Sequence, residues 1–166
     1  MSRLRTRTLE LVPKTAVEMR AAVEAMDGDQ RAQLSADWLA RLRAATSTDP
    51  WIHGFSAVLR PGGEVIGTGG FKGPPASGTV EIAYGVIPDQ QSKGYGTEIA
   101  AALVEYALRF ADVDVVRAHT LPESAASQRI LIKCGFQRIG EFMDPEDGLV
   151  WRFERRRPTA SGASVA

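Results

Sequence analysis

A strand, a glycine-containing loop, a long helix and a second strand follow one another between residues 79 and 121, and this order constrains the fold more than any other feature. Thr79–Ile87 alternates apolar residues with small or polar ones, as a strand does. Tyr95–Phe110 carries apolar residues at spacings of three and four, and Val113–Leu121 is a short β-rich run. Because a helical connection joins neighbouring strands in parallel, the sequence predicts a parallel pair with a crossover helix.

Alternating runs on both sides of this unit predict antiparallel hairpins. Phe55–Leu59 and Val65–Phe71 flank a turn with Pro-Gly-Gly, and Phe136–Met143 and Leu149–Phe153 flank Asp-Pro-Glu-Asp-Gly. A first strand is expected over Leu4–Val12. The sequence therefore predicts an α/β (α+β) fold, with one mixed, mostly antiparallel sheet and helices on both faces.

Three further helices are expected, over about residues 15–26, 34–46 and 124–134. The first begins with Thr-Ala-Val-Glu, which has the spacing of a capping box. The second presents four apolar side chains on one face. The third follows Ser124 as its N-cap and is ended by Gly135.

The composition fits one globular domain without a metal centre. A length of 166 residues is usual for one domain, and 44% hydrophobic residues suffice for a packed core. One domain is expected over residues 1–157, followed by a disordered tail of small residues over 158–166. With one cysteine and two histidines, no metal site is expected.

The charge balance and the hydropathy argue against two classes of partner. Lys plus Arg and Asp plus Glu both number 20, so no basic excess indicates nucleic-acid binding. No run approaches the roughly 18 apolar residues of a membrane span, and no signal-peptide core follows the basic N-terminus. The protein is therefore expected to be cytoplasmic, with no nucleic-acid or membrane partner. The sequence leaves a homodimer open.

The stretch with the clearest chemical meaning connects the first strand of the parallel pair to the long helix. Residues Gln91–Thr97 read Gln-Ser-Lys-Gly-Tyr-Gly-Thr. Two glycines allow a sharp turn that points several backbone N–H groups at one spot at a helix N-terminus, where an anion is favoured. The stretch matches neither the Walker loop nor the dinucleotide fingerprint. It predicts a loop that binds a pyrophosphate. The alternative is a helix start that requires glycine only for its backbone conformation.

Two separated motifs occur in this order of elements. Gln-x-x-Gly-x-Gly stands at Gln91–Gly96, and Lys-Cys-Gly-Phe stands at residues 133–136. With these motifs, residues 4–154 resemble the GNAT superfamily of acetyl-CoA-dependent N-acetyltransferases. Three runs are similar to the Rim-type branch of this superfamily, which contains the ribosomal-protein N-terminal acetyltransferases and their relatives. These runs are Gly94–Glu98, Ala118–Glu123 and Ser127–Phe136.

This resemblance implies acetyl-CoA as the co-substrate and no metal. The backbone at Val86 and Ile87 would pair with the pantetheine arm between two splayed central strands, and an N–H near Ile87 would stabilise the developing oxyanion. Ser124 would contact the pantetheine. The residues implied at the pyrophosphate are Gln91, Ser92, Lys93, Gly94, Tyr95, Gly96 and Thr97.

The sequence departs from the family pattern at two positions. Ser124 stands where many members have Asn, and Leu131 stands where several branches have a Tyr that protonates the departing thiolate. Rim-type relatives share the second absence. By that resemblance Ser127, one turn earlier, is the implied partner of the thiolate.

Three residues are candidates for the base that takes the proton of the acceptor amine. Glu81 is the first choice, because period-two counting places it beside the cofactor site and on the same side as Ile87. A surface charge or a cross-strand charge pair is the alternative. His119 fits a structural role better, and Tyr84 is expected in the core. Cys134 is expected to be a small buried hydrophobe and not a nucleophile.

The predicted function is direct transfer of acetyl from acetyl-CoA to a primary amine, through a tetrahedral intermediate. The acceptor is a protein or peptide N-terminus or an amine-bearing small molecule. A non-catalytic acyl-CoA sensor is the alternative, suggested by Ser124 and Leu131. Clustered carboxylates near Glu64, Glu81 and Glu141 would favour a cationic small molecule, and their absence would favour a peptide terminus.

Overall fold

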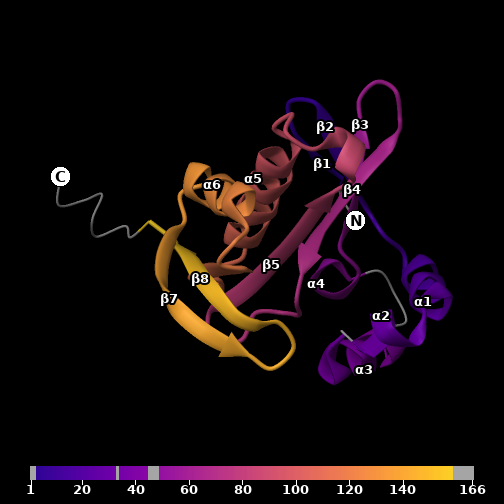
Figure 1. Ribbon diagram of the computed structural model, residues 1–166. Coiled ribbons are helices and arrows are strands. Elements are labelled where there is room, and N and C mark those ends of the chain that lie inside the picture. The colour runs from indigo at the N-terminus through magenta and orange to yellow at the C-terminus, as the bar shows by residue number, and fades with distance from the viewer. Residues whose placement is uncertain (1–2, 33, 45–48, 159–166) are drawn as a thin grey trace.

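An eight-stranded mixed sheet forms the centre of the protein, as the computed structural model shows (Figure 1). The structure describes residues 3–158, except residue 33 and residues 45–48. The expected tail therefore lies outside the described residues from residue 159 onward. In spatial order the strands are β1 (Leu4–Arg5), β2 (Leu9–Pro13), β3 (Phe55–Leu59), β4 (Val65–Phe71), β5 (Thr79–Val86), β6 (Val115–Thr120), β8 (Gly148–Arg156) and β7 (Gln137–Asp144).

Helices accompany the sheet on both sides. They are α1 (Ala16–Ala25), α2 (Gly28–Ala32), α3 (Ala36–Ala44), α4 (Pro50–His53), α5 (Tyr95–Leu108) and α6 (Ala125–Lys133), with a 3-10 turn, η1, at Pro88–Gln90. In Figure 1 the strands β4 and β5 pass between α5 and α6 on one side and α1, α2 and α3 on the other. The predicted α/β fold is confirmed.

The strands β5 and β6 form the predicted parallel pair, with α5 as the crossover, and the other strand pairs are antiparallel. Their pairing runs only from Thr79 opposite Val115 to Glu81 opposite Arg117. Beyond Glu81, β5 continues to Val86 while bonded to β4 alone. The two central strands therefore separate at Glu81, and one edge of β5 is left unpaired.

The N-terminal region contains more elements than the sequence predicted. The chain reverses between β1 and β2, where the N–H of Thr6 donates to Leu9 O at 2.9 Å, so the expected single strand is a hairpin. The helix α4 was not predicted, although Asp49 and Pro50 form a start signal. The Asp49 carboxylate accepts a hydrogen bond from the N–H of Trp51 at 2.9 Å.

Capping residues explain where the first helices begin. Thr15 and Glu18 form the predicted capping box of α1. Asp27 forms the same kind of reciprocal pair with Gln30 at the start of α2, at 2.8 and 3.0 Å. Ser35 then accepts from the N–H of Trp38 at 3.0 Å as α3 begins. The expected second helix is α3, and the capped start at Asp27 adds the short helix α2, which was not predicted.

The core lies where α5 crosses β4 and β5. Gly69 of β4 allows the close approach of this helix, because a Cβ there would lie 2.6 Å from Ile99 Cγ2. Ile99 and Leu103 are fully buried against it. This packing fixes the start of α5 beside the unpaired end of β5.

Glu98, in the first turn of α5, links this helix to the β1–β2 turn by hydrogen bonds. Its carboxylate accepts hydrogen bonds from Thr6 Oγ1 at 2.5 Å, Thr8 N at 2.9 Å and Thr8 Oγ1 at 2.7 Å. Partial burial raises the pKa of this carboxyl, but the hydrogen bonds from Thr6 and Thr8 outweigh burial and hold the pKa below its usual value of 4.5.

Replacing Glu98 with Gln is expected to lower the free energy of unfolding by about 2 kcal/mol at pH 7, because charge-assisted hydrogen bonds are lost. A carboxyl with a lowered folded-state pKa stabilises the fold above its unfolded-state pKa, so the difference should shrink as the pH falls below 4.5. Urea denaturation at several pH values measures both effects. Glu105→Gln, at an exposed position of the same helix, is the control, and an equal loss there would contradict the assignment.

Candidate active site

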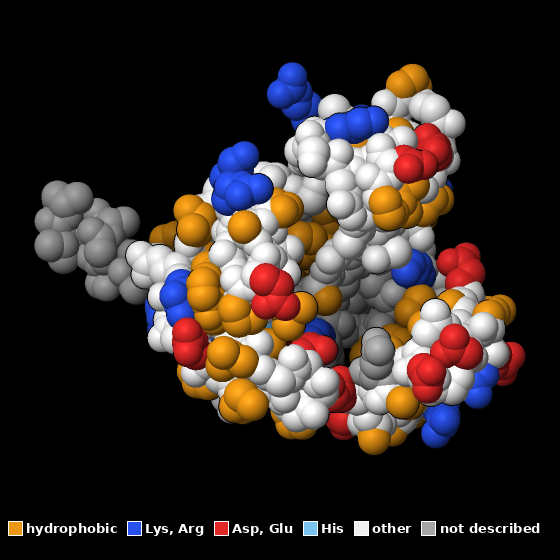
Figure 2. Space-filling view, viewed as in Figure 1, with side chains coloured by type: hydrophobic (Ala, Val, Ile, Leu, Met, Phe, Trp, Pro, Cys, Tyr) orange, Lys and Arg blue, Asp and Glu red, His pale blue; other side chains and the backbone are white. Residues whose placement is uncertain are grey.

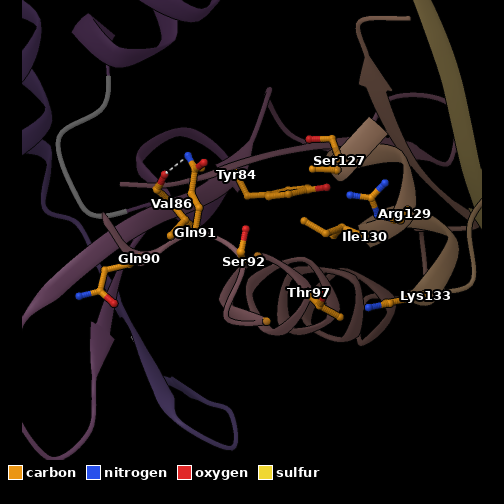
Figure 3. A pocket seen from close by; sticks show the side chains of 14 residues that line it. Tyr84, Val86, Gln90, Gln91, Ser92, Thr97, Ser127, Arg129, Ile130 and Lys133 are labelled. Carbon is orange, nitrogen blue, oxygen red and sulfur yellow. Dashed lines mark hydrogen bonds between the residues drawn. The ribbon is translucent and has the colours of Figure 1, made fainter. Parts of the chain in front are cut away.

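A cavity of about 480 Å³ lies beside the unpaired end of β5, between the start of α5 and the wall of α6 (Figure 3). Three segments that are distant in the sequence therefore meet at one place. The described residues that line the cavity are Tyr84, Gly85, Val86, Gln90, Gln91, Ser92, Gly94, Gly96, Thr97, Ala126, Ser127, Arg129, Ile130 and Lys133.

The glycine loop leaves backbone donors uncommitted at the start of α5. Ser92 and Gly94 have positive φ angles of 64° and 89°, so the chain enters left-handed conformations before the helix. Gly94 is the N-cap and has no side chain to cap the helix, so the N–H groups of residues 95–97 lack intrahelical acceptors. Such an array of N–H groups at a helix N-terminus favours an anion.

Side chains around the loop hold it in place. Gln91 Nε2 donates to Val86 O at 2.9 Å, the dashed line in Figure 3, and so braces the loop against β5. Lys93 Nζ donates to Gln90 Oε1 at 3.0 Å, and Lys93 is not among the lining residues. The loop is thereby held between β5 and the first turn of α5.

Gly96 allows α6 to approach the start of α5. A Cβ at Gly96 would lie 2.8 Å from Ile130 Cδ1 of α6. The second glycine of the motif lies inside α5 and leaves room there for the Ile130 side chain, whereas Gly94 makes the turn.

The unpaired edge of β5 presents backbone groups of Tyr84 and Val86 to the gap. The N–H of Ile87 donates to Ile66 O of the neighbouring strand β4 at 2.9 Å. Because the hydrogen-bonded pairs alternate along an antiparallel ladder, the N–H groups of Tyr84 and Val86 point the other way, toward the separated β6. The donor expected near Ile87 is thus not Ile87 itself, whose N–H is already bonded.

Of the residues predicted for the site, seven line the cavity: Val86, Gln91, Ser92, Gly94, Gly96, Thr97 and Ser127. The structure does not place Ile87, Lys93, Tyr95, Ser124 or Glu81 in this lining. Tyr95 packs against the hydrophobic core, and Ser124 is the N-cap of α6 without a side-chain capping bond. Leu131 is fully buried, so this position cannot supply a proton donor.

Tyr84 packs against the hydrophobic core, as the sequence predicted, and it also lines the cavity, which the sequence did not predict. Figure 3 shows its ring reaching from β5 toward α6, with the hydroxyl on the Ser127 side. Burial raises the pKa of the phenol to about 12, the nearby Cys134 adds to the rise, and a hydrogen bond with Ser127 opposes it. The phenol therefore stays protonated at neutral pH and can donate a hydrogen bond beside Ser127.

Glu81 points to the sheet face opposite Tyr84, since side chains alternate along β5, and its carboxylate is paired there. Glu81 Oε2 lies 3.2 Å from Lys72 Nζ and 2.9 Å from His119 Nδ1, and Arg152 Nε donates to His119 Nε2 at 3.0 Å. Because a guanidinium can only donate, His119 Nε2 accepts and its Nδ1–H donates to Glu81.

These contacts determine what Glu81 can do as a base. Burial raises the pKa of this carboxyl, but the hydrogen bond from His119 and the charge of Lys72 outweigh burial, so the pKa lies below 4.5. Glu81 is therefore ionised at neutral pH and is a weak base. His119 has both ring nitrogens engaged, which fits the structural role expected for it.

Figure 2 shows a cleft over β4 and β5, between the lobe that carries α5, α6, β7 and β8 and the lobe that carries α1 to α3. Its floor is uncharged, and acidic side chains gather at its lower end, where the β7–β8 turn lies. In this turn, the charges of Asp147 and Asp144 act on Lys72, the partner of Glu81. The acidic end of the cleft is thus electrostatically coupled to the Glu81 cluster.

The three carboxylates singled out in the sequence do not form one cluster. Glu141 of β7 pairs with Arg138 at 2.9 Å. Glu64 is exposed in the β3–β4 turn, and Glu81 is paired with Lys72. Each therefore has its own surroundings.

Cys134 ends α6 as a buried residue. The residue is 6% exposed, and its Sγ lies 3.7 Å from Thr97 O. Burial raises the pKa of the thiol, so the thiolate is disfavoured at neutral pH. The residue is the small buried hydrophobe that the sequence predicted.

Groups of metal-binding side chains and membrane-spanning helices are absent from the residues that the structure describes. Among them, no group of three or more His, Cys, Asp and Glu side chains could hold a metal ion. None of their helices has the length and hydropathy needed to span a membrane.

Comparison with known proteins identifies the family. The family model described as an acetyltransferase (GNAT) domain matches residues 3–137. The chain therefore belongs to the GNAT acetyltransferase family, as the sequence predicted.

A curated relative and two solved structures are similar to the chain. The uncharacterized N-acetyltransferase YnaD of Bacillus subtilis is 33% identical over 88 residues, which are 53% of this chain and 52% of that protein. The chain spans about half the length of the curated relatives that it matches.

The two solved structures show the same fold. RimL, a ribosomal L7/L12 α-N-protein acetyltransferase solved with coenzyme A, has a TM-score of 0.65 and 16% identity over 93% of this chain and 98% of that one. The aminoglycoside acetyltransferase AAC(6′)-Ib, solved with coenzyme A, has a TM-score of 0.62 and 19% identity over 90% and 95%.

Proposed function

We propose that the protein transfers the acetyl group of acetyl-CoA directly to a primary amine. The observation that carries the proposal is the cavity at the unpaired edge of β5, with the uncommitted N–H groups of the α5 N-terminus at one end and Ser127 at the other. A pyrophosphate suits the N–H groups, and an extended amide chain suits the unpaired strand edge. When bound, acetyl-CoA supplies an acetyl group activated as a thioester.

The chain's own residues have three tasks in this reaction. The N–H groups of Tyr84 and Val86 face the gap and would stabilise negative charge on the acyl oxygen. As the C–N bond forms and the C–S bond breaks, Ser127 would donate a hydrogen bond to the departing thiolate. Glu81 is the proposed acceptor of the proton that the amine nitrogen loses.

An α-amino group of a protein or peptide is the proposed acceptor. Because Glu81 is a weak base, it suits an amine that loses its proton easily. An α-amino group titrates near 7.7 to 8.0, against about 10.4 for a lysine side chain. The separate placement of Glu64, Glu81 and Glu141 also gives no single acidic patch for a polycation. The similar structures include enzymes for both acceptor classes, a ribosomal protein and aminoglycosides.

The pH dependence of the reaction tests the acceptor class. With a peptide that has a free α-amino group, kcat/KM for thiol release should rise with pH to a plateau with an apparent pKa near 8. The same peptide blocked at its N-terminus but carrying a lysine should react at least roughly tenfold more slowly at pH 7.5. Faster reaction of the lysine peptide or of an aminoglycoside would overturn the choice of acceptor.

Glu81→Gln tests the role of this carboxylate. We expect kcat to fall by roughly 100-fold with the α-amino peptide, because a general base typically contributes that much or more. Glu141→Gln is the matched control, since Glu141 is a paired carboxylate outside the Glu81 cluster. Equal rates for the wild type and Glu81→Gln would exclude Glu81 as the base. A cytoplasmic location and the lack of a nucleic-acid partner stay predictions, and a homodimer stays open.

A further inference from the structure

Four side chains on one face of the sheet form a row that ends at Glu81. Glu81 belongs to β5, His119 to β6, Arg152 to β8 and Phe142 to β7. Glu81 Oε2 lies 2.9 Å from His119 Nδ1, and Arg152 Nε donates to His119 Nε2 at 3.0 Å. The guanidinium carbon of Arg152 lies 3.7 Å from the centre of the Phe142 ring. The row thus connects the proposed base to the β7–β8 hairpin.

The hydrogen bond and the ion pairs of the Glu81 carboxylate use only one of its two oxygens. His119 Nδ1 and Lys72 Nζ both lie near Oε2, at 2.9 and 3.2 Å. Among the residues that the structure describes, Oε1 has no such partner. A carboxylate oxygen without a donor keeps its lone pairs available for a proton. Oε1 is therefore the oxygen that can take the proton of an amine.

Arg152 constrains the protonation of His119. A guanidinium has only donors, so Nε2 can accept from Arg152 only while it carries no proton. The proton of the neutral ring then sits on Nδ1 and is donated to Glu81 Oε2. An imidazolium would instead hold Glu81 as an ion pair and make the carboxylate a still weaker base. The contact with Arg152 therefore keeps His119 in the form that orients Glu81 without a full positive charge beside it.

The β7–β8 hairpin in turn holds Arg152. The cation lies over the face of Phe142, an arrangement that is attractive. A Cβ at Gly140 would lie 3.3 Å from Phe142 Cε2, so glycine leaves room for this ring. Arg117, on the same face of β6, donates to Glu154 at 2.7 and 2.9 Å. It is thus not available to take the place of Arg152.

The charged groups around His119 come from the neighbouring segments of the sheet. Lys72, Arg117 and Arg152 are positive, and Glu81, Asp144 and Glu154 are negative. Of these groups, Arg152 contacts Nε2. Its loss would therefore remove both the donor and the positive charge that oppose a proton at this atom.

We infer that Arg152 is a positioning residue for the reaction: acting through His119, it holds Glu81 by Oε2 and leaves Oε1 to take the proton of the acceptor amine. The inference rests on the proposed function, since Glu81 must be the base. As the C–N bond forms, the proton passes from the amine nitrogen to Oε1, and the electron pair of the broken C–S bond leaves with the thiolate. Arg152 exchanges no proton in this step.

Arg152→Met tests this role by its effect on the rate. With the α-amino peptide, we expect kcat to fall by roughly tenfold, since the base is present but less well held. The KM of the peptide and the dissociation constant of acetyl-CoA should change by less than about twofold. Arg152→Lys should restore most of the rate, because its amine keeps the charge and can donate to His119 Nε2. In a Glu81→Gln background, Arg152→Met should have almost no further effect, because it acts through Glu81.

¹⁵N NMR of the imidazole rings gives a readout that general destabilisation would not change. The chain has two histidines. His53 Nδ1 accepts from Asp49 N at 2.8 Å, so a neutral His53 carries its proton on Nε2 and serves as the internal reference. At pH 7 the wild type should show His119 with its proton on Nδ1. In Arg152→Met the His119 signals should move toward those of an imidazolium, and the His53 signals should stay.

Arg138→Met is the matched control for the loss of a stacked arginine. Arg138 stacks on Trp151 at 3.7 Å and pairs with Glu141, on the opposite face of the same hairpin. Both variants should lower the melting temperature, but only Arg152→Met should lower kcat and alter the His119 signals. Equal losses of kcat in the two variants would assign the effect to the stability of the hairpin and overturn the inference.

The remaining outcomes separate the inference from the proposed function. A wild-type kcat for Arg152→Met, together with a slow Glu81→Gln, would overturn the inference alone. A further loss of about tenfold on adding Arg152→Met to Glu81→Gln would show that Arg152 acts independently of Glu81, which also overturns it. A wild-type rate for Glu81→Gln would reject the proposed base, and no thiol release by the wild-type protein would reject the proposed function. The inference would fall with either.

Discussion

Replacing Gly94 with Val is expected to weaken acetyl-CoA binding by roughly 100-fold. Gly94 has φ 89° and ψ 0°, a left-handed conformation that costs a β-branched residue about 1 to 3 kcal/mol. The chain would relieve this strain by turning the N–H groups of residues 95–97 away from the anion, and each charge-assisted bond so lost is worth about 1.5 to 3 kcal/mol. Titration calorimetry measures the loss.

Gly63→Val is the matched control for this variant. Gly63, in the β3–β4 turn, has φ 80°, and, as at Gly94, a Cβ there would meet nothing within 4 Å. The two variants therefore carry similar backbone strain at different sites. Both should lower the melting temperature, but only Gly94→Val should lose affinity. Equal losses of affinity would show that general destabilisation, and not the loop, causes the effect.

Ser127→Ala is expected to lower kcat by roughly 100-fold while leaving the dissociation constant of acetyl-CoA unchanged. A donor aimed at charge that develops in the transition state contributes about this much. Ser127 lines the cavity on α6, and Leu131, one turn later, is buried and has no proton to give. Rapid measurement of thiol release gives kcat, and calorimetry gives the dissociation constant. An unchanged kcat would remove Ser127 from the mechanism.

Tyr84→Phe distinguishes the role of the Ser127 hydroxyl from that of the neighbouring Tyr84 hydroxyl. The hydroxyl of Tyr84 lies on the Ser127 side of the cavity, and with a pKa of about 12 it stays protonated throughout the assay range. Its loss should therefore lower kcat less than the loss of Ser127 and should not shift the pH profile. A larger effect than that of Ser127→Ala would make Tyr84, and not Ser127, the group that donates to the thiolate.

The sheet and the long helix could be predicted because they bury one face each. The alternation of Thr79–Ile87 and the helical spacing of Tyr95–Phe110 record which side chains face the core. The glycine loop between them could be predicted as well, since only glycine adopts the conformation at Gly94 without strain. The strand, the helix and the loop could be predicted because residues close together in the sequence determine each of them.

The position of Tyr84 depends on where two distant strands part. Alternation placed Tyr84 correctly on the face of Ile82, which is buried. The pairing of β5 with β6 ends at Glu81, however, so the residues beyond it face a cavity and not a neighbouring strand. The bond from Ile87 N–H to Ile66 O likewise follows from strand register. Neither feature has a signal in the local sequence.

The surroundings of Glu81 could not be predicted for a similar reason. Lys72 follows β4 and His119 belongs to β6, so two separate segments lower the pKa of this carboxyl, and Arg152 of β8 binds His119. The sequence indicated a carboxylate near the reaction site. It left a cross-strand charge pair open, but it did not indicate which residues pair with the carboxylate and make it weakly basic.

The most direct test of the central claim is titration of the purified protein with acetyl-CoA, followed on the same sample by thiol release with a peptide that has a free α-amino group. We expect micromolar binding and thiol release that requires the peptide. Binding without release by the peptide or by any amine of a broad panel would contradict the proposed reaction and favour an acyl-CoA sensor. An absence of binding would contradict the assignment of the cavity itself.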